Sequence, residues 1–382
     1  MKGNRFCLVF VIPDLRIGGA ERHAATLLCE LAARGHRVAI VCIEAGGPMA
    51  HGLAEAGVTV VELALGTAWK WRMLASGSRV AHALHQLAPD VVMTSGYSAE
   101  VLTRLVLRGR ADQPLLSWKH NIGHLGRFGV RDRLTERVLG RWVTRYLAVS
   151  YTQVGYLRGY LRLDPARIVV LRNAIELLDR ASDVERATTR RELGVAGEQV
   201  IIGCVAVLRS EKDHATLIKA LALLPKSSMA VLVLVGDGPL RENLAELARA
   251  KGLAERVRFL GTREDVPRLL ATFDVAVLAS QTVENLPYAA LEAMASGLPV
   301  VSTAVGAMAE LIDDGVTGWL IPPRSPTMLA DRLSRLIYDA GVRARMGEAA
   351  RERVTAGFQL TQLVSATERE VREVIRDGRH CG

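Results

Sequence analysis

The sequence predicts an α/β protein with two doubly wound parallel-sheet domains. Short apolar runs alternate with helix-like segments along all 382 residues, which is the pattern of repeated β-α units. The runs are continuously apolar, as expected for strands that helices cover on both faces. The length also favours two domains, because a domain usually has about 100–200 residues.

The strands are predicted directly from these apolar runs. In the first half of the chain they are Leu8–Ile12, Val38–Ile43, Thr59–Leu63, Val91–Thr94, Leu115–Trp118 and Tyr146–Val149. In the second half they are Val200–Val207, Ala230–Val235, Val257–Leu260, Val275–Leu278 and Pro299–Ser302. Helices are expected between them, for example over Ala20–Arg34 and Leu240–Lys251.

A domain boundary is expected where this alternation stops. The stretch from Asn173 to Leu193 is polar and shows no strand signal. We therefore predict one Rossmann-like domain over residues 1–172 and a second over 173–357. Ligands of open α/β sheets bind outside the carboxyl ends of the strands, so functional residues should lie in the loops that follow strands.

Composition indicates a cytoplasmic protein whose membrane contacts, if any, are peripheral. No stretch approaches the roughly 20 uncharged apolar residues of a membrane-spanning helix. The first apolar run, Phe6–Ile12, lacks a cleavage-site pattern, so we interpret it as a strand. The five cysteines show neither a CxxC motif nor a disulfide framework, which fits a reducing compartment.

The net charge of +9 is distributed unevenly. Residues 1–172 contain 23 Lys/Arg and 12 Asp/Glu, whereas the remainder contains 26 and 28. Most of the excess lies between Arg104 and Arg172. This is either a solvated basic surface or a surface for an anionic partner such as a membrane leaflet or a lipid diphosphate. No nucleic-acid partner is expected, because aromatic residues make up only 5% and no nucleic-acid motif is present.

Two short motifs follow predicted strands and could bind phosphate. Ile17–Arg22 (IGGAER) opens a helix, and its glycines, Gly18 and Gly19, would let a phosphate or sugar approach the backbone. Arg209 and Lys212 follow the next domain's first strand and would suit a diphosphate. Each motif alone is also compatible with a purely structural turn or with surface charge. A third element, VGDGPL at 235–240, is assigned mainly to a turn.

The longest motif runs from Glu284 to Val301. It predicts a helix over Pro287–Ala295 that stops at Gly297 before a new strand. The start of this helix could hold a phosphate through backbone N–H groups. Glu292 lies within the helix and could accept two hydrogen bonds from a ribose diol.

Histidines give weaker signals. His120 and Asn121 follow a predicted strand, as Gly306 and Glu310 do further along the chain. The pairs His82/His85 and His120/His124 have helical spacing, but no carboxylate or cysteine completes either set, so we predict no metal site.

Taken in order, the motifs resemble those of the retaining glycosyltransferases of family 4. The family's elements fall on Gly18–Arg22 (GGAER), Val235–Arg241 (VGDGPLR), Val257–Gly261 (VxFLG), the Glu284/Glu292 pair (E-x7-E) and Asp313–Leu320 (DDGVTGWL). The resemblance covers nearly the whole chain. It implies the GT-B fold, in which two Rossmann-like domains face each other across a cleft, with residues 358–382 forming a helix that crosses back to the first domain. The first domain, residues 1–172, would bind the acceptor, and the second, residues 173–357, would bind the nucleotide sugar.

The resemblance also implies a role for each motif residue. Glu284 would touch the donor sugar, Glu292 the ribose, and His120 the region of the reacting sugar. Arg209 and Lys212 would neutralise the diphosphate. The remaining donor-binding positions would be Gly18, Gly19, Asn285, Leu286, Pro287 and Tyr288 around the phosphates, and Gly261, Thr262 and Arg263 around the base.

Three positions depart from the family pattern. The family often has Arg five residues before its Lys, where this chain has Val207 and carries its Arg at 209. The usual NG-I-D hinge reads Asn173–Glu176 (NAIE), and a usual glycine pair reads Gly306-Ala307.

The activity implied by the resemblance is transfer of a hexose-type sugar, with retention, from a nucleoside-diphosphate sugar. A UDP-sugar is the expected donor, and no cofactor or metal is expected, because no DxD motif is present. The expected acceptor is a lipid-linked or envelope polysaccharide or lipopolysaccharide precursor. The segment Leu125–Val149 is interpreted as a basic amphipathic helix suited to anionic lipid. Two alternatives remain: a sugar-nucleotide epimerase of the same fold, and a non-catalytic sugar-nucleotide-binding subunit.

Overall fold

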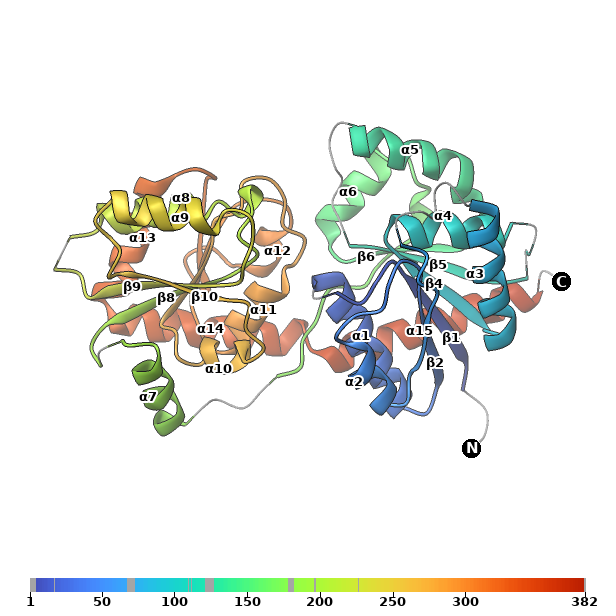
Figure 1. Ribbon diagram of the computed structural model, residues 1–382, viewed down its shortest axis with the longest axis horizontal. Coiled ribbons are helices and arrows are strands. Elements are labelled where there is room, and N and C mark those ends of the chain that lie inside the picture. Colours follow the sequence, from blue (N-terminus) through green and yellow to red (C-terminus); the bar gives the residue numbers. More distant parts are fainter. Residues whose placement is uncertain are drawn as a thin grey trace. The chain divides into compact units, whose positions relative to one another are not determined.

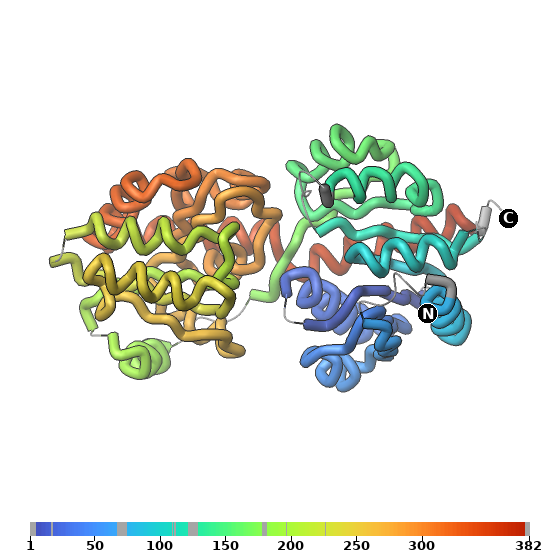
Figure 2. Tube along the Cα trace, turned by 45° about the horizontal axis from the view of Figure 1, so that its top comes forward, coloured from blue at the N-terminus to red at the C-terminus, as the bar shows by residue number. Residues whose placement is uncertain are grey.

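The computed structural model describes residues 5–16, 18–66, 73–108, 110, 112–120, 127–177, 182–195, 197–225 and 227–380. Contacts divide the chain into two compact units (Figures 1 and 2). Unit 1 comprises Met1–Asn173 and Leu360–Gly382, and unit 2 comprises Ala174–Gln359. The units meet in sequence at 173/174 and 359/360, where we predicted limits at 172 and 357.

Unit 1 is built on a seven-stranded parallel sheet in the order β3-β2-β1-β4-β5-β6-β7. The strands are β1 (Cys7–Ile12), β2 (Arg37–Cys42), β3 (Thr59–Glu62), β4 (Val91–Ser95), β5 (Leu115–Lys119), β6 (Arg145–Ala148) and β7 (Ile168–Val170). Its helices are α1 (Gly19–Ala33), α2 (Ala50–Glu55), α3 (Met73–Leu87), α4 (Tyr97–Val106), α5 (Arg127–Leu139), η2 (Gly140–Trp142), α6 (Tyr151–Gly159), η3 (Pro165–Arg167) and α15 (Leu360–His380).

Helices cover both faces of this sheet. Figure 1 shows α3, α4, α5 and α6 on one face and α1, α2 and α15 on the other. Val9 and Val11 of β1 join the core under the first group, while the intervening Phe10 is equally buried. The C-terminal helix α15 is attached through Glu368, which accepts a hydrogen bond from the ring nitrogen Nε2 of His36 at 2.8 Å.

Unit 2 is built on a six-stranded parallel sheet in the order β10-β9-β8-β11-β12-β13. The strands are β8 (Val200–Val205), β9 (Ala230–Val235), β10 (Val257–Gly261), β11 (Val275–Leu278), β12 (Val300–Thr303) and β13 (Gly318–Ile321). Its helices are α7 (Asp183–Glu192), η4 (Ser210–Lys212), α8 (His214–Leu223), α9 (Arg241–Ala250), α10 (Val266–Leu270), α11 (Tyr288–Ala295), α12 (Met308–Leu311), α13 (Pro326–Tyr338) and α14 (Ala340–Gly357).

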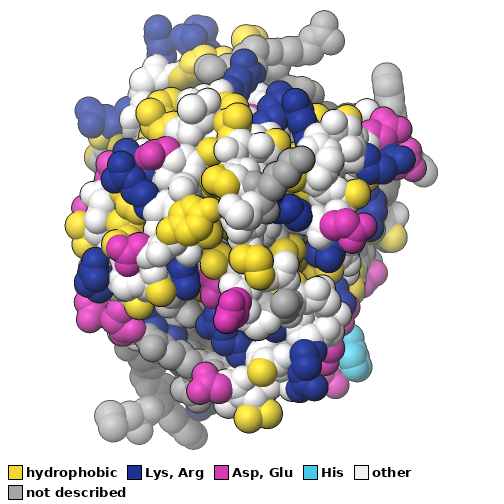
Figure 3. Space-filling view, turned by 90° about the vertical axis from the view of Figure 1, so that its left-hand side faces the viewer, with side chains coloured by type: hydrophobic (Ala, Val, Ile, Leu, Met, Phe, Trp, Pro, Cys, Tyr) yellow, Lys and Arg dark blue, Asp and Glu magenta, His cyan; other side chains and the backbone are white. Residues whose placement is uncertain are grey.

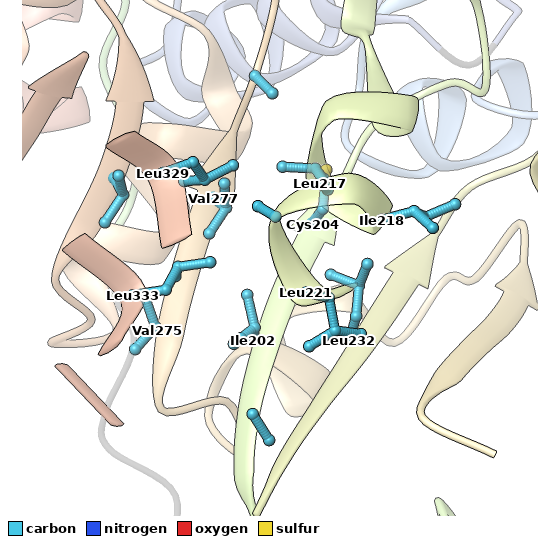
Figure 4. Packing of buried hydrophobic residues seen from close by; sticks show 14 of the residues in the cluster. Ile202, Cys204, Leu217, Ile218, Leu221, Leu232, Val275, Val277, Leu329 and Leu333 are labelled. Carbon is cyan, nitrogen blue, oxygen red and sulfur yellow. The ribbon is translucent and has the colours of Figure 1, made fainter. Parts of the chain in front are cut away.

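The core of unit 2 explains why its strands read as continuous apolar runs. Successive side chains of a strand point to opposite faces, so both sets must be apolar when both faces are covered. Ile202 and Cys204 pack under α8, α9 and α13, whereas Ile201 belongs to the cluster formed with α10, α11 and α14. Figure 4 shows the first cluster, with Leu217 from α8 and Leu333 from α13 lying over the strands.

The strand orders place one switch point in each sheet. In unit 1 the chain leaves β1 toward β2 and β3 and returns to the other side of β1 as β4. In unit 2 it leaves β8 toward β9 and β10 and returns as β11. Ligands of open α/β sheets bind in the crevice beyond the strand ends at such points. Ligand sites are therefore expected at the β1/β4 and β8/β11 strand ends.

The structure corrects several sequence-based expectations. Strands β7 and β13 were not predicted. β7 has only three residues, all half-buried, and β13 begins at Gly318, where a Cβ would lie 2.0 Å from the carbonyl oxygen of Val300. The first strand of unit 2 ends at Val205, so Val207 belongs to the loop and is 45% exposed.

The segment Leu125–Val149 is not one helix. Residues 125–126 lie outside the described ranges, α5 ends at Leu139, and β6 begins at Arg145. Tyr146 is instead a buried strand residue, and its hydroxyl donates to the carboxylate of Glu136 in α5 at 2.8 Å. Val143, which falls within the segment that we interpreted as a surface helix, is buried in the core. Across the described residues, no helix combines the length and apolar character needed to span a bilayer.

Candidate functional site

Two predicted site residues meet at the β8/β11 switch point of unit 2. Lys212 ends η4, in the loop after β8, and Glu284 lies in the loop after β11. The Nζ atom of Lys212 is 2.5 Å from Oε1 of Glu284, and the Ser280 hydroxyl donates to the same carboxylate oxygen. The Glu284 side chain is 6% exposed and that of Lys212 is 28% exposed. A buried carboxylate is thus held by a cation that still reaches solvent.

The backbone of Glu284 is held as firmly as its side chain. Its carbonyl oxygen accepts a hydrogen bond from the N–H of Ala307 at 2.7 Å. A Cβ at Gly306 would lie 2.0 Å from that oxygen, and Gly306 has a φ of +57°. Only glycine satisfies both conditions. The glycine that follows β12 is therefore required for the position of Glu284.

The residues after Glu284 lead into helix α11. Leu286 is fully buried and has a φ of +49°, a left-handed conformation that costs a residue with a Cβ about 1–3 kcal/mol. Pro287 is extended and caps the helix, which begins at Tyr288. The first N–H groups of a helix have no acceptor within it and carry a partial positive charge. The buried side chain of Leu286 thus fixes the position of the N-terminus of α11.

Glu292 lies one turn further along α11. It follows Tyr288 by four residues, so the two side chains share a face of the helix. Glu292 is half-buried, whereas Leu291 and Ala293 on either side are fully buried in the core. The carboxylate therefore lies at the border between the core and the helix surface.

The loop after β8 rests directly on the turn after β9. Cβ atoms at Gly236 and Gly238 would lie 2.2 Å and 2.6 Å from the carbonyl oxygens of Ala206 and Leu208. The glycines of the VGDGPL element thus allow close packing beneath this loop, in agreement with their assignment to a turn. Arg209, in the same loop, is exposed.

The three predicted base-binding residues lie at the end of β10. The carbonyl oxygen of Gly261 accepts a hydrogen bond from the N–H of Gly236 at 2.8 Å. Gly261 has a φ of +69°. Thr262 and Arg263 are exposed, and Arg263 forms an ion pair with Asp265 at 2.7 Å. Because β9 separates β10 from β8, these residues share the carboxyl edge of the sheet with Lys212 without touching it in the described contacts.

The predicted residues of unit 1 surround its own switch point. Gly18 caps α1, and a Cβ there would lie 2.1 Å from Oε2 of Glu21; Gly19 is exposed. His120 follows β5, and its ring centroid is 4.9 Å from that of His23. Burial lowers the pKa of His120 to about 3, so the ring is neutral at neutral pH. Ile17 and Asn121 lie outside the described residues.

A cavity of about 260 Å³ opens at this switch point. Its walls come from the ends of β1, β4 and β5, from the start of α1, and from the inner sides of α5 and α6. Glu21 and His120 are among the lining residues, so the cavity joins the glycine motif to the histidine.

A buried cluster of four charges forms one wall of this cavity, and sequence analysis did not find it. Arg104 donates to Glu100 at 3.1 Å and to Glu136 at 3.0 Å. Lys119 lies 2.5 Å from Glu100 and 2.7 Å from Glu136. Only the i, i+4 spacing of Glu100 and Arg104 was visible in the sequence. Burial alone would raise the pKa of Glu136, but Lys119 and Arg104 hold it well below its ordinary value.

The two histidine pairs with helical spacing do not form a metal site in the part of the chain that the structure describes. His82 and His85 are exposed on α3, and His124 lies outside the described ranges. Within those ranges no group of three His, Cys, Asp or Glu side chains is placed to hold an ion.

Comparison with known proteins places both units in glycosyltransferase families. Residues 17–177 match Glycosyltransferase Family 4, and residues 185–353 match Glycosyl transferases group 1. The chain belongs to the family 4 glycosyltransferases. Its relatives include the N-acetyl-alpha-D-glucosaminyl L-malate synthase of Bacillus anthracis, 34% identical over 50% of each chain. The D-inositol 3-phosphate glycosyltransferase of Actinosynnema mirum is 28% identical over 78% of this chain and 76% of the relative. The chain spans about half the length of the first curated relatives that it matches.

The solved structures identify the fold of this family 4 member as GT-B. Anabaena Alr3699/HepE, solved in complex with UDP and glucose, aligns over 97% of this chain and 100% of its own, with a TM-score of 0.87 and 23% identity. WaaG, a glycosyltransferase involved in lipopolysaccharide biosynthesis, aligns over 95% and 99%, with a TM-score of 0.74 and 20% identity. The family and the fold expected from the motifs are thereby confirmed.

Proposed function

We propose that this protein transfers a hexose-type sugar from a nucleoside-diphosphate sugar, with UDP as the nucleotide, to a saccharide acceptor. The observation that carries the proposal is the meeting of Lys212 and Glu284 at the β8/β11 switch point, beside the N-terminus of α11. A partly exposed cation and a helix N-terminus both favour a phosphate. The UDP complexes of Alr3699/HepE support this choice of nucleotide.

The donor is proposed to contact unit 2 in three places. Lys212, Arg209 and the backbone of residues 285–288 meet the diphosphate. Glu284 contacts the sugar hydroxyls, and Glu292 contacts the ribose. The backbone of residues 261–263 meets the base. In unit 1, Gly18 and Gly19 are proposed to contact the donor phosphate, and His120, neutral at neutral pH, the reacting sugar.

The proposed chemistry is a front-face substitution with retention. The acceptor hydroxyl oxygen bonds to C1 of the sugar while the bond from C1 to the β-phosphate oxygen breaks. That oxygen leaves with the bonding electrons and takes the hydroxyl proton, so the products are a glycosylated acceptor and UDP. Positive charge fixed at the leaving group would lower the barrier by several kcal/mol. Because Lys212, Arg209 and α11 supply it, we propose that no metal is needed.

A thermal-shift screen of UDP-, GDP- and ADP-sugars tests the donor. Binding at 100 times Kd should stabilise the protein by about 2.7 kcal/mol. We expect a UDP-sugar to raise the melting temperature of the unchanged protein, and we expect Glu292→Ala to abolish this stabilisation. Glu255→Ala, which removes an exposed carboxylate from the same unit, should not affect the shift. A protein that none of these nucleotide sugars stabilises would contradict the proposal.

Turnover separates the transferase from its two alternatives. An epimerase would convert the donor sugar without an acceptor, and a non-catalytic binding subunit would bind the donor without converting it. Product stereochemistry, read from the anomeric proton by NMR, tests retention. Equal rates before and after treatment with EDTA are expected for a metal-independent reaction.

The acceptor is proposed to be lipid-linked, as in envelope polysaccharide or lipopolysaccharide assembly, and to be met at the cytoplasmic surface of an anionic membrane. The exposed face of α5 supports this. Val130, Leu134 and Val138 recur every four residues and are 64%, 61% and 51% exposed. Arg133 and Arg137 lie exposed beside them. An apolar stripe flanked by arginines suits an interfacial helix. By contrast, Figure 3 shows a face, on the side of α7 and α13, where basic and acidic side chains are interspersed.

Vesicle flotation tests this surface. We expect binding to vesicles that contain phosphatidylglycerol at low salt, weaker binding to pure phosphatidylcholine, and loss of binding in Leu134→Ser. Val316→Ser removes an apolar side chain that is 51% exposed on unit 2, and it should bind like the unchanged protein. Absence of binding to the anionic vesicles would rule out α5 as a docking helix.

A further inference from the structure

The cavity of unit 1 has the size of a site for one sugar ring. Its volume of about 260 Å³ is near the lower bound of roughly 300 Å³ for small-ligand pockets. It lies where the ends of β1 and β4 diverge, which is where open α/β sheets bind ligands. Its location and size therefore suit a compact ligand, and the polar groups of its walls indicate which kind.

The lysine in the wall is already neutralised. Lys119 contacts both Glu100 and Glu136, and Arg104 binds the same two carboxylates from behind. The four side chains are at most 13% exposed. An anionic ligand would have to compete with these carboxylates for Lys119, which already contacts both of them.

The arginine in the wall is engaged as well. The Arg131 guanidinium lies 3.7 Å from the centroid of the Tyr97 ring and 3.4 Å from Oδ1 of Asp132. Both cations of the wall thus face carboxylates. Glu21 adds a further carboxyl group, whose pKa burial raises. Among the described lining residues, the cavity therefore offers several hydrogen-bond acceptors and no excess of positive charge toward a ligand.

Two buried donors in the wall still lack an acceptor. The indole Nε1 of Trp118 and the hydroxyl of Tyr156 are buried and have no hydrogen-bond partner among the described residues. Trp118 is 0% exposed. Buried polar atoms are normally satisfied, and the two residues that carry these atoms both line the cavity, which points to a ligand that completes them.

We propose that this cavity binds an uncharged sugar ring of the acceptor, and that Trp118 and Tyr156 determine its fit. The inference rests on the proposed transferase function. A hydroxyl group both donates and accepts, so ring hydroxyls can donate to the carboxylates and accept from Trp118 and Tyr156 at once. A carboxylate or phosphate only accepts and would face the carboxylates of the wall. The acceptor is thus distinguished by the absence of charge on the ring that enters the cavity.

Matched sugars test the charge preference by NMR saturation transfer and competition. The neutral probes are the methyl α-pyranosides of glucose, galactose and mannose. The charged probes are the corresponding methyl uronosides and hexose 6-phosphates. We expect at least one neutral ring to bind, and its charged counterparts to bind at least tenfold more weakly. Binding of a charged form as tight as the neutral one, or no neutral binding at 50 mM, would overturn the inference.

Tyr156→Phe tests the proposed contact. Losing the hydroxyl should weaken binding of the neutral ring about fivefold, the value of one hydrogen bond of about 1 kcal/mol. Tyr160→Phe is the control, because Tyr160 stacks on Tyr156 with centroids 5.3 Å apart but does not line the cavity. Equal affinities of the two variants would exclude Tyr156 from the site.

UDP titration of the same samples separates the two proposals. UDP binding without any sugar binding would reject the cavity as acceptor site and leave the donor site intact. Failure of UDP to bind would reject the proposed function itself. The comparison of neutral with charged probes uses the unchanged protein, so it remains decisive even if Tyr156→Phe does not fold.

Discussion

The two switch points are built in opposite ways. At β8/β11 the strand ends present glycines, a helix N-terminus and cations that reach solvent, with one buried carboxylate, Glu284, held between Lys212 and Ser280. At β1/β4 the cavity is walled by side chains, and the charges behind it are paired and buried. The same topology thus supports one site made mostly of backbone and another made mostly of side chains.

This difference shows what each site can recognise. Backbone N–H groups and solvent-accessible cations suit a diphosphate, a ligand shared by all nucleotide-sugar donors. Fixed side chains with unsatisfied donors suit a ligand of defined shape. The proposed donor site is therefore visible in the sequence as a motif, whereas the proposed acceptor site depends on side chains from distant parts of the chain.

The largest effect is expected from the buried charges of unit 1. Glu136→Ala leaves Arg104 and Lys119 with one carboxylate between them and should lower the free energy of unfolding by about 3–5 kcal/mol. Glu55→Ala removes an exposed ion pair with His51 from the same unit and should cost at most about 1 kcal/mol. Similar losses in urea unfolding of both variants would mean that the Glu136 cluster is not stabilising.

The same cluster predicts an acid dependence. Burial opposes ionisation of Glu136, but Lys119 and Arg104 dominate and lower its pKa. Its contribution to stability is therefore present above its ordinary value of 4.5 and is lost as the pH falls below it. The unchanged protein should lose more stability than Glu136→Ala between pH 5 and about 3.

The next effect is on catalysis at the donor site. Lys212→Ala should reduce kcat/KM by about 10²–10³, the value of one preorganised group at the leaving charge. Lys219→Ala removes an exposed lysine of α8 and should retain full activity. A loss of less than tenfold in Lys212→Ala would remove this lysine from the leaving-group site.

A smaller effect is expected from the glycine behind Glu284. An alanine at either Gly306 or Gly315 must adopt a left-handed backbone, at a cost of about 1–2 kcal/mol. Only at Gly306 would the new Cβ also meet the carbonyl oxygen of Glu284; at Gly315 nothing lies within 4 Å. Gly306→Ala should therefore lose UDP affinity as well as stability. Equal UDP affinities in the two variants would show that UDP binding does not depend on the contact between Gly306 and the Glu284 backbone.

The smallest effect is expected at Arg263. Its ion pair with Asp265 is exposed, and such pairs contribute at most about 1 kcal/mol. Because the proposed base contact uses the backbone, Arg263→Ala should change UDP affinity less than threefold in calorimetry. A loss of tenfold or more would indicate that the guanidinium itself contacts the nucleotide.

Strand positions could largely be predicted from the sequence, and the reason is physical. Both faces of β8 and β9 are covered, so runs such as Val200–Val205 are apolar at every position. The signal is weaker in β7, whose three residues are half-buried, and in β13, which begins with a glycine. The end of α5 was missed because Tyr146 and Val143, which fall within the segment that we interpreted as a helix, are buried in the core.

The phosphate-binding motif of unit 2 could be predicted from the sequence, whereas the charge cluster of unit 1 could not. The motif at 284–292 indicated a phosphate-binding helix start, but its contact with Lys212 spans 72 residues and depends on β11 pairing with β8. The Glu100–Arg104–Lys119–Glu136 cluster draws on α4, β5 and α5. Only the three-dimensional arrangement of those elements brings the four charges together.

Hydrogen exchange with and without UDP reports where the nucleotide binds. We expect protection of amides in residues 206–212 and 284–292, at the β8/β11 switch point, with little change in the loops after β12 and β13. Protection confined to other parts of the chain, with residues 284–292 unchanged at saturating UDP, would contradict this expectation.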